Sequence, residues 1–180
     1  KLRDGSSFRK FYFDQEEFNY IKPGVAIKDL QKVVKSKYKA KILDCYSMVA
    51  TMRMIKSPAE IEEIKTSIET TRLAFEKALL TTKPGQYEYH IAGTLEHEFM
   101  MHNQSGVAFG TIVASGANAV ILHYPDPKDE LKDGDLVLLD FGAEKNNYRA
   151  DISRTFPING KFSDKQKDNI YFLINSDNSN

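Results

Sequence analysis

One stretch near the C-terminal end, residues 136–157, restricts the fold more than any other part of the chain. An apolar run ends at Asp140, the chain turns at a Lys-Asn-Asn triplet, and it returns through a second mixed stretch that contains Asp151. Asparagine tolerates the positive φ that tight hairpin turns require. We therefore predict a β-hairpin whose turn is centred between Lys145 and Asn146.

This turn would place residues whose numbers add up to 291 opposite each other, so that Asp140 faces Asp151. Their Cβ atoms would then lie about 4.5–5.5 Å apart. Asp140 follows four aliphatic residues, and an ionised carboxylate near a buried sheet is costly without a partner. Either one carboxyl group holds a proton at a raised pKa, or a cation lies between the two, and a shared divalent metal is the commoner solution. The alternative is a register slip of one residue, which places both on opposite faces as ordinary strand-end aspartates.

Two amphipathic helices precede the hairpin. A hydroxyl cap at Ser57, a proline and a glutamate predict that the first helix begins there and extends over 57–82. Its expected apolar face consists of Ile61, Ile64, Ile68, Phe75 and Leu79. A second helix is expected over 87–102, and β-rich runs are expected to form strands at 111–113, 120–122, 136–139 and 148–156. Helices followed by a strand-rich sheet predict an α+β fold.

The first fifty residues have a different pattern. A strand at 10–13, a helix at 26–34 and a strand at 41–43 form a strand–helix–strand unit. Because two strands cannot bury both of their faces, we interpret residues 1–52 as the closing part of an α/β domain and residues 53–180 as a second domain. The alternative is a small subdomain that packs on the rest of the chain.

The charge balance and the single cysteine restrict the partners. Lys and Arg number 25, as do Asp and Glu, so the chain lacks the excess positive charge expected of nucleic-acid or anionic-membrane binding. Cys45 has no second cysteine to pair with, and no apolar run approaches the length of a membrane span. We expect a cytoplasmic protein that acts on peptides or small molecules, not on nucleic acid or a membrane.

Three histidines bear on a metal site. His97 and His102 are five residues apart, which rotates them about 140° from each other on a helix, so they cannot share one ion. We expect both to be solvated. His123 ends the predicted strand at 120–122 and precedes a Tyr-Pro-Asp-Pro loop, where it either faces a cleft or makes a structural hydrogen bond.

Several motifs taken together resemble one family. These are MIKSPAEI at 54–61, TIVASGAN at 111–118, ILHY at 121–124, DGDLVLLDFGAE at 133–144 and ADISRTFPINGKFS at 150–163. In order and spacing they resemble the Xaa-Pro aminopeptidases of the M24 metallopeptidases, a group that also contains prolidases, methionine aminopeptidases and creatinase.

The resemblance implies a pita-bread fold, in which helices pack on a curved antiparallel sheet, and residues 53–180 would form its N-terminal half. It implies two divalent metal ions, manganese above all, with cobalt or zinc as alternatives, and it assigns Asp140 and Asp151 as metal ligands. It also assigns His123 as the catalytic residue that stabilises the tetrahedral intermediate. The implied substrate is a peptide with proline in second position.

The chain departs from the family most clearly in its metal ligands. The remaining family ligands, a histidine and two glutamates, belong to the second half of the fold, and no histidine follows His123. We therefore expect weak metal binding by this chain alone and, because half a sheet leaves an open edge, a homo-oligomer. The alternatives are a prolidase, a pita-bread module that binds peptides without cleaving them, and a truncated product that folds poorly.

Overall fold

The computed structural model describes residues 10–13, 32, 35–36, 41–102 and 106–169. The chain divides into two compact units, Lys1–Ser57 and Pro58–Asn180, and each is described by itself. The assignment of residues 1–52 and 53–180 to two named domains stays a prediction.

The first unit contains a pair of parallel strands. Strand β1 spans Lys10–Phe13 and β2 spans Lys41–Asp44, with Lys10 opposite Lys41. Both strands were predicted, and parallel pairing requires a crossover between them. The helix predicted at 26–34 lies outside the described residues, apart from Lys32. An unpredicted helix, α3, follows over Tyr46–Met54.

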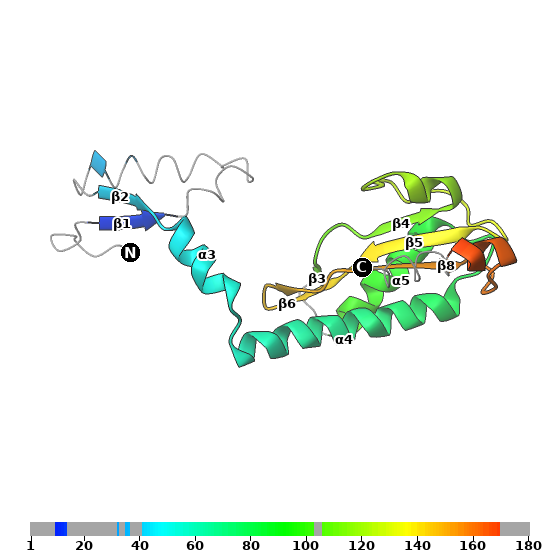
Figure 1. The fold of residues 1–180 in the computed structure, drawn as a ribbon, viewed down its shortest axis with the longest axis horizontal. Coiled ribbons are helices and arrows are strands. Elements are labelled where there is room, and N and C mark those ends of the chain that lie inside the picture. Colours follow the sequence, from blue (N-terminus) through cyan, green and yellow to red (C-terminus); the bar gives the residue numbers. More distant parts are fainter. Residues whose placement is uncertain (1–9, 14–31, 33–34, 37–40, 103–105, 170–180) are drawn as a thin grey trace. The chain divides into compact units, whose positions relative to one another are not determined.

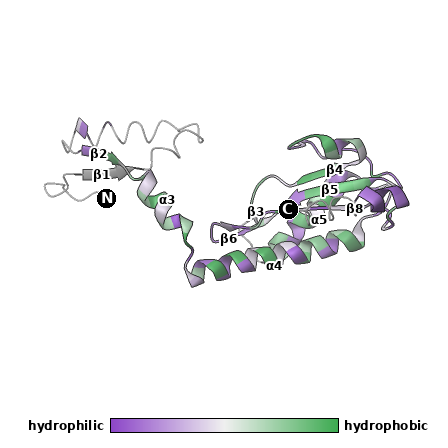
Figure 2. Ribbon diagram, in the orientation of Figure 1, coloured by the Kyte–Doolittle hydropathy of each residue, from purple (hydrophilic) through white to green (hydrophobic). Residues whose placement is uncertain are grey.

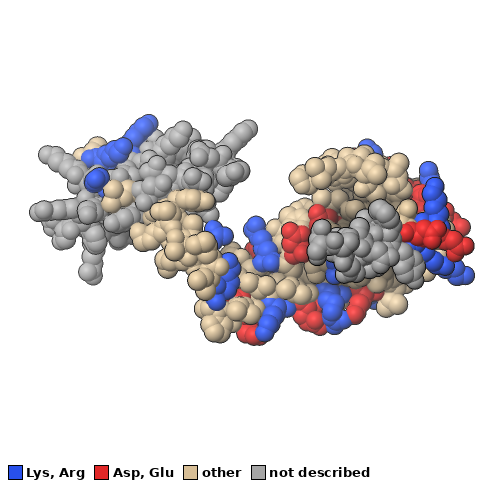
Figure 3. Space-filling model, in the orientation of Figure 1, with Lys and Arg blue, Asp and Glu red and all other residues tan. Residues whose placement is uncertain are grey.

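Two helices begin the second unit, as predicted. Helix α4 spans Pro58–Thr81 and α5 spans Glu88–Met101, and they pack against each other beside the strands (Figure 1). Acidic and basic side chains alternate along the outer side of α4 (Figure 3), where Glu62 pairs with Lys65 at 2.9 Å and Glu69 pairs with Arg72 at 2.7 Å.

The predicted apolar face of α4 is wrong for three of its five residues. Ile61, Ile68 and Leu79 are each more than 40% exposed, and the buried positions of the helix are Ser67, Thr70, Thr71, Ala74 and Ala78. Figure 2 accordingly shows apolar and polar residues interspersed along α4. Small side chains let the helix backbone approach α5 and the hairpin closely, and this close packing decides the buried face against the count of large apolar residues.

The strands of the second unit form two antiparallel three-stranded sheets. One has the order β3–β6–β7, formed by Gly106–Val107, Ala143–Lys145 and Tyr148–Arg149, and the other has the order β4–β5–β8, formed by Ile112–Ser115, Leu136–Phe141 and Ile152–Pro157. The single strand predicted at 148–156 is therefore divided at residues 150–151. The predicted α+β class, with helices packed on antiparallel strands, is confirmed.

The strand predicted at 120–122 is also wrong. A 3-10 helix, η1, occupies Gly116–Val120 and the chain then turns. Val120 and Leu122 are 87% and 86% exposed. Strand-forming residues without a neighbouring strand have no ladder to join, so their propensity does not decide the structure here.

The hairpin is present, but with a different register. Asn146 and Asn147 have φ values of 50° and 67° and form the two-residue turn, so the turn lies one residue later than predicted. Lys145 faces Tyr148 and Asp140 faces Ser153, which gives pair sums of 293 in place of 291. Both the predicted pairing of Asp140 with Asp151 and its one-residue alternative are therefore wrong.

The core lies between the helices and one face of the β4–β5–β8 sheet. Residues of β5 alternate, with Val137, Leu139 and Phe141 fully buried and Leu136, Leu138 and Asp140 only half-buried. Phe75 of α4 packs on the Phe141 ring at a centroid distance of 5.9 Å. The buried cluster comprises Ala74, Ala78, Ile91, Leu95, Phe99, Val113, Leu131, Val137, Leu139, Phe141, Ala143, Phe156 and Ile158. Asp140 lies on the opposite face of the sheet, away from this core.

Within the described ranges, the structure contains no helix with both the length and the apolar character needed to cross a bilayer.

Candidate functional site

A pocket of about 290 Å³ lies on the face of the β4–β5–β8 sheet that is turned away from the core. Asp140 and Ser153 contribute polar groups from neighbouring strands, and His123 contributes an imidazole from the loop after η1. The rest of the lining is apolar and comprises Ile112, Ala119, Val120, Ile121, Leu122 and Leu138. The structure thus brings two of the three predicted site residues, His123 and Asp140, to one pocket.

The Asp140 carboxylate is half-buried and has one protein partner. Ser153 Oγ donates a hydrogen bond of 3.0 Å to Asp140 Oδ1. No other described side chain or amide bonds this carboxylate, so its second oxygen is available to a ligand in the pocket. A half-buried anion with so few donors is the arrangement in which a cation lowers the electrostatic cost.

Asp151 lies outside the lining of this pocket. It is exposed, and its carboxylate has no hydrogen-bond partner among the described residues. Continuing the register of 293 places Asp151 opposite Gly142 and two residues before Ser153. Side chains alternate between the two faces of a strand, so Asp151 shares a face with Ser153 in a regular ladder. Because Ser153 pairs with Asp140, Asp140 and Asp151 would be diagonal neighbours on one face, about 7–8 Å apart.

Gly142 marks an irregular step in this ladder. It separates β5 from β6, and a Cβ atom at this position would lie 1.8 Å from the carbonyl oxygen of Ala150. Only glycine allows the two strands to approach each other so closely at the point between Asp140 and Asp151. The sequence carries this signal as the glycine in the DFGAE motif.

His123 has an unusual backbone. Its φ of 52° lies in the left-handed region, it is exposed, and it belongs to a turn. A non-glycine residue in this region is uncommon and costs of order 1 kcal/mol, which the surrounding structure must offset. The sequence correctly placed His123 before a loop, although not at a strand end.

Helix α4 anchors the hairpin that carries the two aspartates. Thr71 Oγ1 accepts a 3.0 Å hydrogen bond from the Ala143 amide, and Ser67 Oγ donates to the Tyr148 carbonyl oxygen at 2.9 Å. The Tyr148 hydroxyl donates to Glu60 at 2.9 Å. These bonds explain why hydroxyl residues replace large apolar ones on the buried face of α4.

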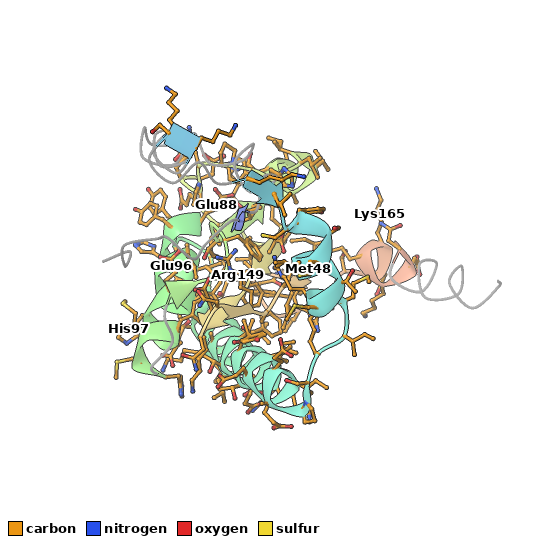
Figure 4. The ribbon with its side chains drawn as sticks, turned by 90° about the vertical axis from the view of Figure 1, so that its left-hand side faces the viewer. Met48, Glu88, Glu96, His97, Arg149 and Lys165 are labelled. Atoms are coloured by element: carbon orange, nitrogen blue, oxygen red, sulfur yellow. The ribbon has the colours of Figure 1, made fainter. Side chains whose placement is uncertain are left out.

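Glu88 is a residue that the sequence reasoning missed. It is fully buried in the first turn of α5. Figure 4 labels Glu88 together with Glu96 and His97, which lie further along the same helix. Burial alone would raise the pKa of Glu88. Hydrogen bonds from Asn118, Ser115 and Asp129 outweigh this effect and hold the pKa of the carboxyl group below its ordinary value.

A signal for Glu88 exists in the sequence. Glu88 precedes Ile91 by three residues and Leu95 by seven, so it belongs to the apolar face of the helix. An acidic residue on such a face is expected to be buried and to need donors. The run of small residues at 114–118 supplies some of these donors, from Ser115 and Asn118.

Two further histidines are solvated, as predicted. His97 and His102 are both exposed, and Glu98 Oε2 lies 3.8 Å from His102 Nε2. In the part of the chain that the structure describes, no three side chains of His, Cys, Asp or Glu gather closely enough to hold a metal ion.

The donor groups of Asp140, Asp151 and His123 fit part of a divalent metal site. Carboxylate oxygens and an imidazole nitrogen are ligands that manganese and related ions accept. Asp140 supplies an oxygen with no protein partner, and Asp151 supplies two. Two carboxylates leave such an ion with fewer protein ligands than a complete site has.

Comparison with known proteins decides the family. The description "Metallopeptidase family M24" matches residues 62–176, which is more than half of the chain. The chain belongs to metallopeptidase family M24. Membership of a metallopeptidase family implies divalent metal ions, in agreement with these donor groups.

The M24 relatives that resemble this chain include Xaa-Pro aminopeptidases. That of Escherichia coli is 43% identical over 135 residues, and that of Haemophilus influenzae is 46% identical over 135 residues. These matches cover 75% of this chain but only 30% and 31% of the two relatives. The chain therefore spans about a third of the length of the curated relatives it matches.

Solved structures show the same fold. Aminopeptidase P from E. coli with the inhibitor Pro-Leu superposes with a TM-score of 0.75 at 39% identity, covering 88% of this chain and 37% of that chain. Proline aminopeptidase P II from Yersinia pestis gives 0.76 at 34% identity, covering 88% and 37%. The second unit of this chain is thus part of an aminopeptidase P fold, as the resemblance implied.

Proposed function

We propose that this M24 chain carries the aspartate-bearing part of the active site of an Xaa-Pro aminopeptidase, which releases an N-terminal residue that precedes proline. The observation that supports this most is the shared pocket of His123 and Asp140, in a chain 43–46% identical to two Xaa-Pro aminopeptidases over three quarters of its length. The apolar part of the pocket wall offers a surface for a proline-containing peptide.

In this proposal Asp140 and Asp151 hold divalent metal, with manganese the expected ion. When bound, such ions lower the pKa of water and polarise the scissile carbonyl group. Ser153 orients Asp140 through its hydrogen bond at 3.0 Å. His123 lines the same pocket, and its imidazole N–H can donate to the oxygen of a tetrahedral intermediate.

The finer parts of the proposal concern the setting. We propose a cytoplasmic homo-oligomer, a proline-containing peptide as the substrate, and residues 1–52 as the end of an α/β domain. A prolidase differs in requiring a dipeptide, and a non-catalytic pita-bread module would bind peptide without releasing a residue.

The test is release of the N-terminal residue from an Xaa-Pro-Xaa tripeptide by the purified chain, with and without manganese. Because the proposed homo-oligomer must complete the site, we expect slow manganese-dependent release, which Asp151→Asn abolishes and which a control, Glu96→Gln on the exposed side of α5, leaves intact. A prolidase would cleave an Xaa-Pro dipeptide and not the tripeptide. Peptide binding without release, by a chain shown to be folded, would contradict the proposal and favour the binding module.

A further inference from the structure

The most heavily bonded side chain in the described structure is one that the proposed reaction does not use. Glu88 is 0% exposed, yet its carboxylate accepts six hydrogen bonds. Oε1 accepts from the Ser115 amide at 2.7 Å, from Ser115 Oγ at 2.8 Å and from Asn118 Nδ2 at 3.0 Å. Oε2 accepts from the Tyr124 hydroxyl at 3.1 Å and from the Lys128 and Asp129 amides at 3.0 Å.

These donors all come from one stretch of chain, residues 115–129, which connects β4 to the loop before β5. Ser115 and Asn118 lie at its start, and Lys128 and Asp129 lie at its end. A single carboxylate therefore closes segment 115–129 at its base, and the Glu88 amide strengthens the closure by donating to the Asp129 carbonyl oxygen at 2.9 Å.

His123 lies in the middle of this closed segment. Its neighbours Val120 and Leu122 are 87% and 86% exposed, so packing holds this part of the segment only weakly. Tyr124, the next residue, is only 7% exposed and reaches Glu88 with its hydroxyl group. The left-handed backbone of His123 thus lies directly beside a residue that is fixed to Glu88.

We propose that Glu88 is a positioning residue, which fixes segment 115–129 so that His123 faces the pocket containing Asp140. This inference rests on the proposed function for the role of His123. It goes beyond that function by assigning a task to a buried acid on α5 that does not reach the pocket itself.

A purely structural role is the competing explanation. A buried carboxylate also stabilises a fold when all its lone pairs are bonded, although a well-packed apolar side chain often stabilises as much. The two explanations differ in where the loss of Glu88 acts. A positioning role predicts an effect that is largest in segment 115–129 and is transmitted through His123, whereas a general structural role predicts an equal effect over the whole second unit.

The first experiment compares backbone hydrogen exchange in the wild-type chain, in Glu88→Gln and in the matched control Glu96→Gln. Both carboxylate oxygens of Glu88 accept hydrogen bonds from backbone N–H groups. In Glu88→Gln an NH₂ group replaces one of these oxygens and therefore faces N–H donors without an acceptor. We expect the rise in exchange in Glu88→Gln to be about tenfold or more larger at residues 119–125 than in α4 and β5. Unchanged exchange in the segment, or an equal rise in α4 and β5, would overturn the proposal.

The second experiment is a double-mutant cycle on tripeptide cleavage with manganese. Loss of one oxyanion donor lowers kcat by about 10²–10³-fold. If Glu88 acts through His123, Glu88→Gln lowers kcat by no more than this factor and changes KM little. In a His123→Ala background, the same substitution then changes kcat by less than about twofold. Equal effects in both backgrounds would refute a role transmitted through His123.

Two smaller substitutions keep the test valid if Glu88→Gln does not fold. Ser115→Ala and Tyr124→Phe each remove one hydroxyl donor and leave the other five bonds in place. Both should raise exchange at residues 119–125 by less than Glu88→Gln, and no rise in either would count against the proposal. A wild-type chain that cleaves no peptide refutes the proposed function, while the exchange measurement still decides the role of Glu88.

Discussion

Two acidic residues of this chain are treated in opposite ways by their surroundings. Glu88 is fully buried and accepts six hydrogen bonds, whereas Asp140 is half-buried beside an open pocket and accepts one, from Ser153. A carboxylate whose lone pairs are all occupied by hydrogen bonds cannot bind a ligand, whereas a carboxylate with a free oxygen at a pocket can. Accordingly, we assign Glu88 to structure and positioning and Asp140 to metal binding.

This contrast predicts different effects on stability. Asp140 has one hydrogen-bond donor, Ser153, and Asp140→Asn weakens only this bond. We therefore expect the free energy of unfolding to change by about 0.5 kcal/mol or less. Glu88→Gln leaves buried donors facing each other and should cost on the order of 1–3 kcal/mol. Urea unfolding measures both, and a larger loss for Asp140→Asn than for Glu88→Gln would contradict the assignment.

The lowered pKa of Glu88 predicts an acid-sensitive contribution to stability. Because the pKa is lower in the folded than in the unfolded chain, ionised Glu88 stabilises the fold fully above the ordinary glutamate pKa of about 4.3. The stabilisation is lost as the pH falls through the folded-state pKa. The difference in Tm between the wild type and Glu88→Gln should therefore shrink as the pH falls from 6 towards 3, and a constant difference would show that this pKa shift is absent.

At the scale of elements, the hairpin owes its position to α4 more than to its own turn. Thr71 and Ser67 bond the backbone of Ala143 and Tyr148, so one helix holds both strands of the β6–β7 pair. Large apolar residues at these positions would keep the hairpin backbone too far away for such bonds. The same close approach explains why Ile61, Ile68 and Leu79 lie outside.

Thr71→Ala tests this anchoring. The substitution leaves the buried Ala143 amide without its acceptor, so we expect a loss of about 1–3 kcal/mol in the free energy of unfolding. Thr66→Ala is the matched control, because the Thr66 hydroxyl bonds only the Glu62 carbonyl oxygen of its own helix. The control should change stability by about 0.5 kcal/mol or less, and equal losses in the two variants would argue against the anchor.

Gly142→Ala tests the irregular step between β5 and β6. The added methyl group would meet the Ala150 carbonyl oxygen at 1.8 Å, so the strands must separate, at a cost of roughly 1–3 kcal/mol or more. Gly93→Ala on α5 is the control, since a Cβ atom there meets nothing within 4 Å and alanine favours a helix interior by about 0.5–1 kcal/mol. Thermal unfolding should give Tm changes of opposite sign for the two variants.

At the scale of the whole molecule, the sequence predicted the element types of the second unit well and their contacts less well. Capping residues and periodicity located α4 and α5 to within a residue or two, because these signals are local. The buried face of α4 and the register of the hairpin depend on tertiary packing and on both asparagines adopting positive φ. No single stretch of sequence contains that information.

The same limit applies to the site. The spacing of Asp140 and Asp151 led to a metal hypothesis through a direct pairing that the structure does not have. The family motifs led to the same residues independently, and the structure places Asp140 and His123 at one pocket. Glu88 was missed because its six donors are 27 to 41 residues away along the chain.

The most direct test of the metal hypothesis is a manganese titration of the chain, followed by the electron paramagnetic resonance signal of the free ion. We predict weak binding that either Asp140→Asn or Asp151→Asn reduces further, because two carboxylates without further ligands form an incomplete site. Asp168→Asn, at an exposed aspartate elsewhere, should bind as the wild type does. Binding that neither site substitution affects, or no binding to the wild type at all, would contradict the assignment of Asp140 and Asp151 as metal ligands.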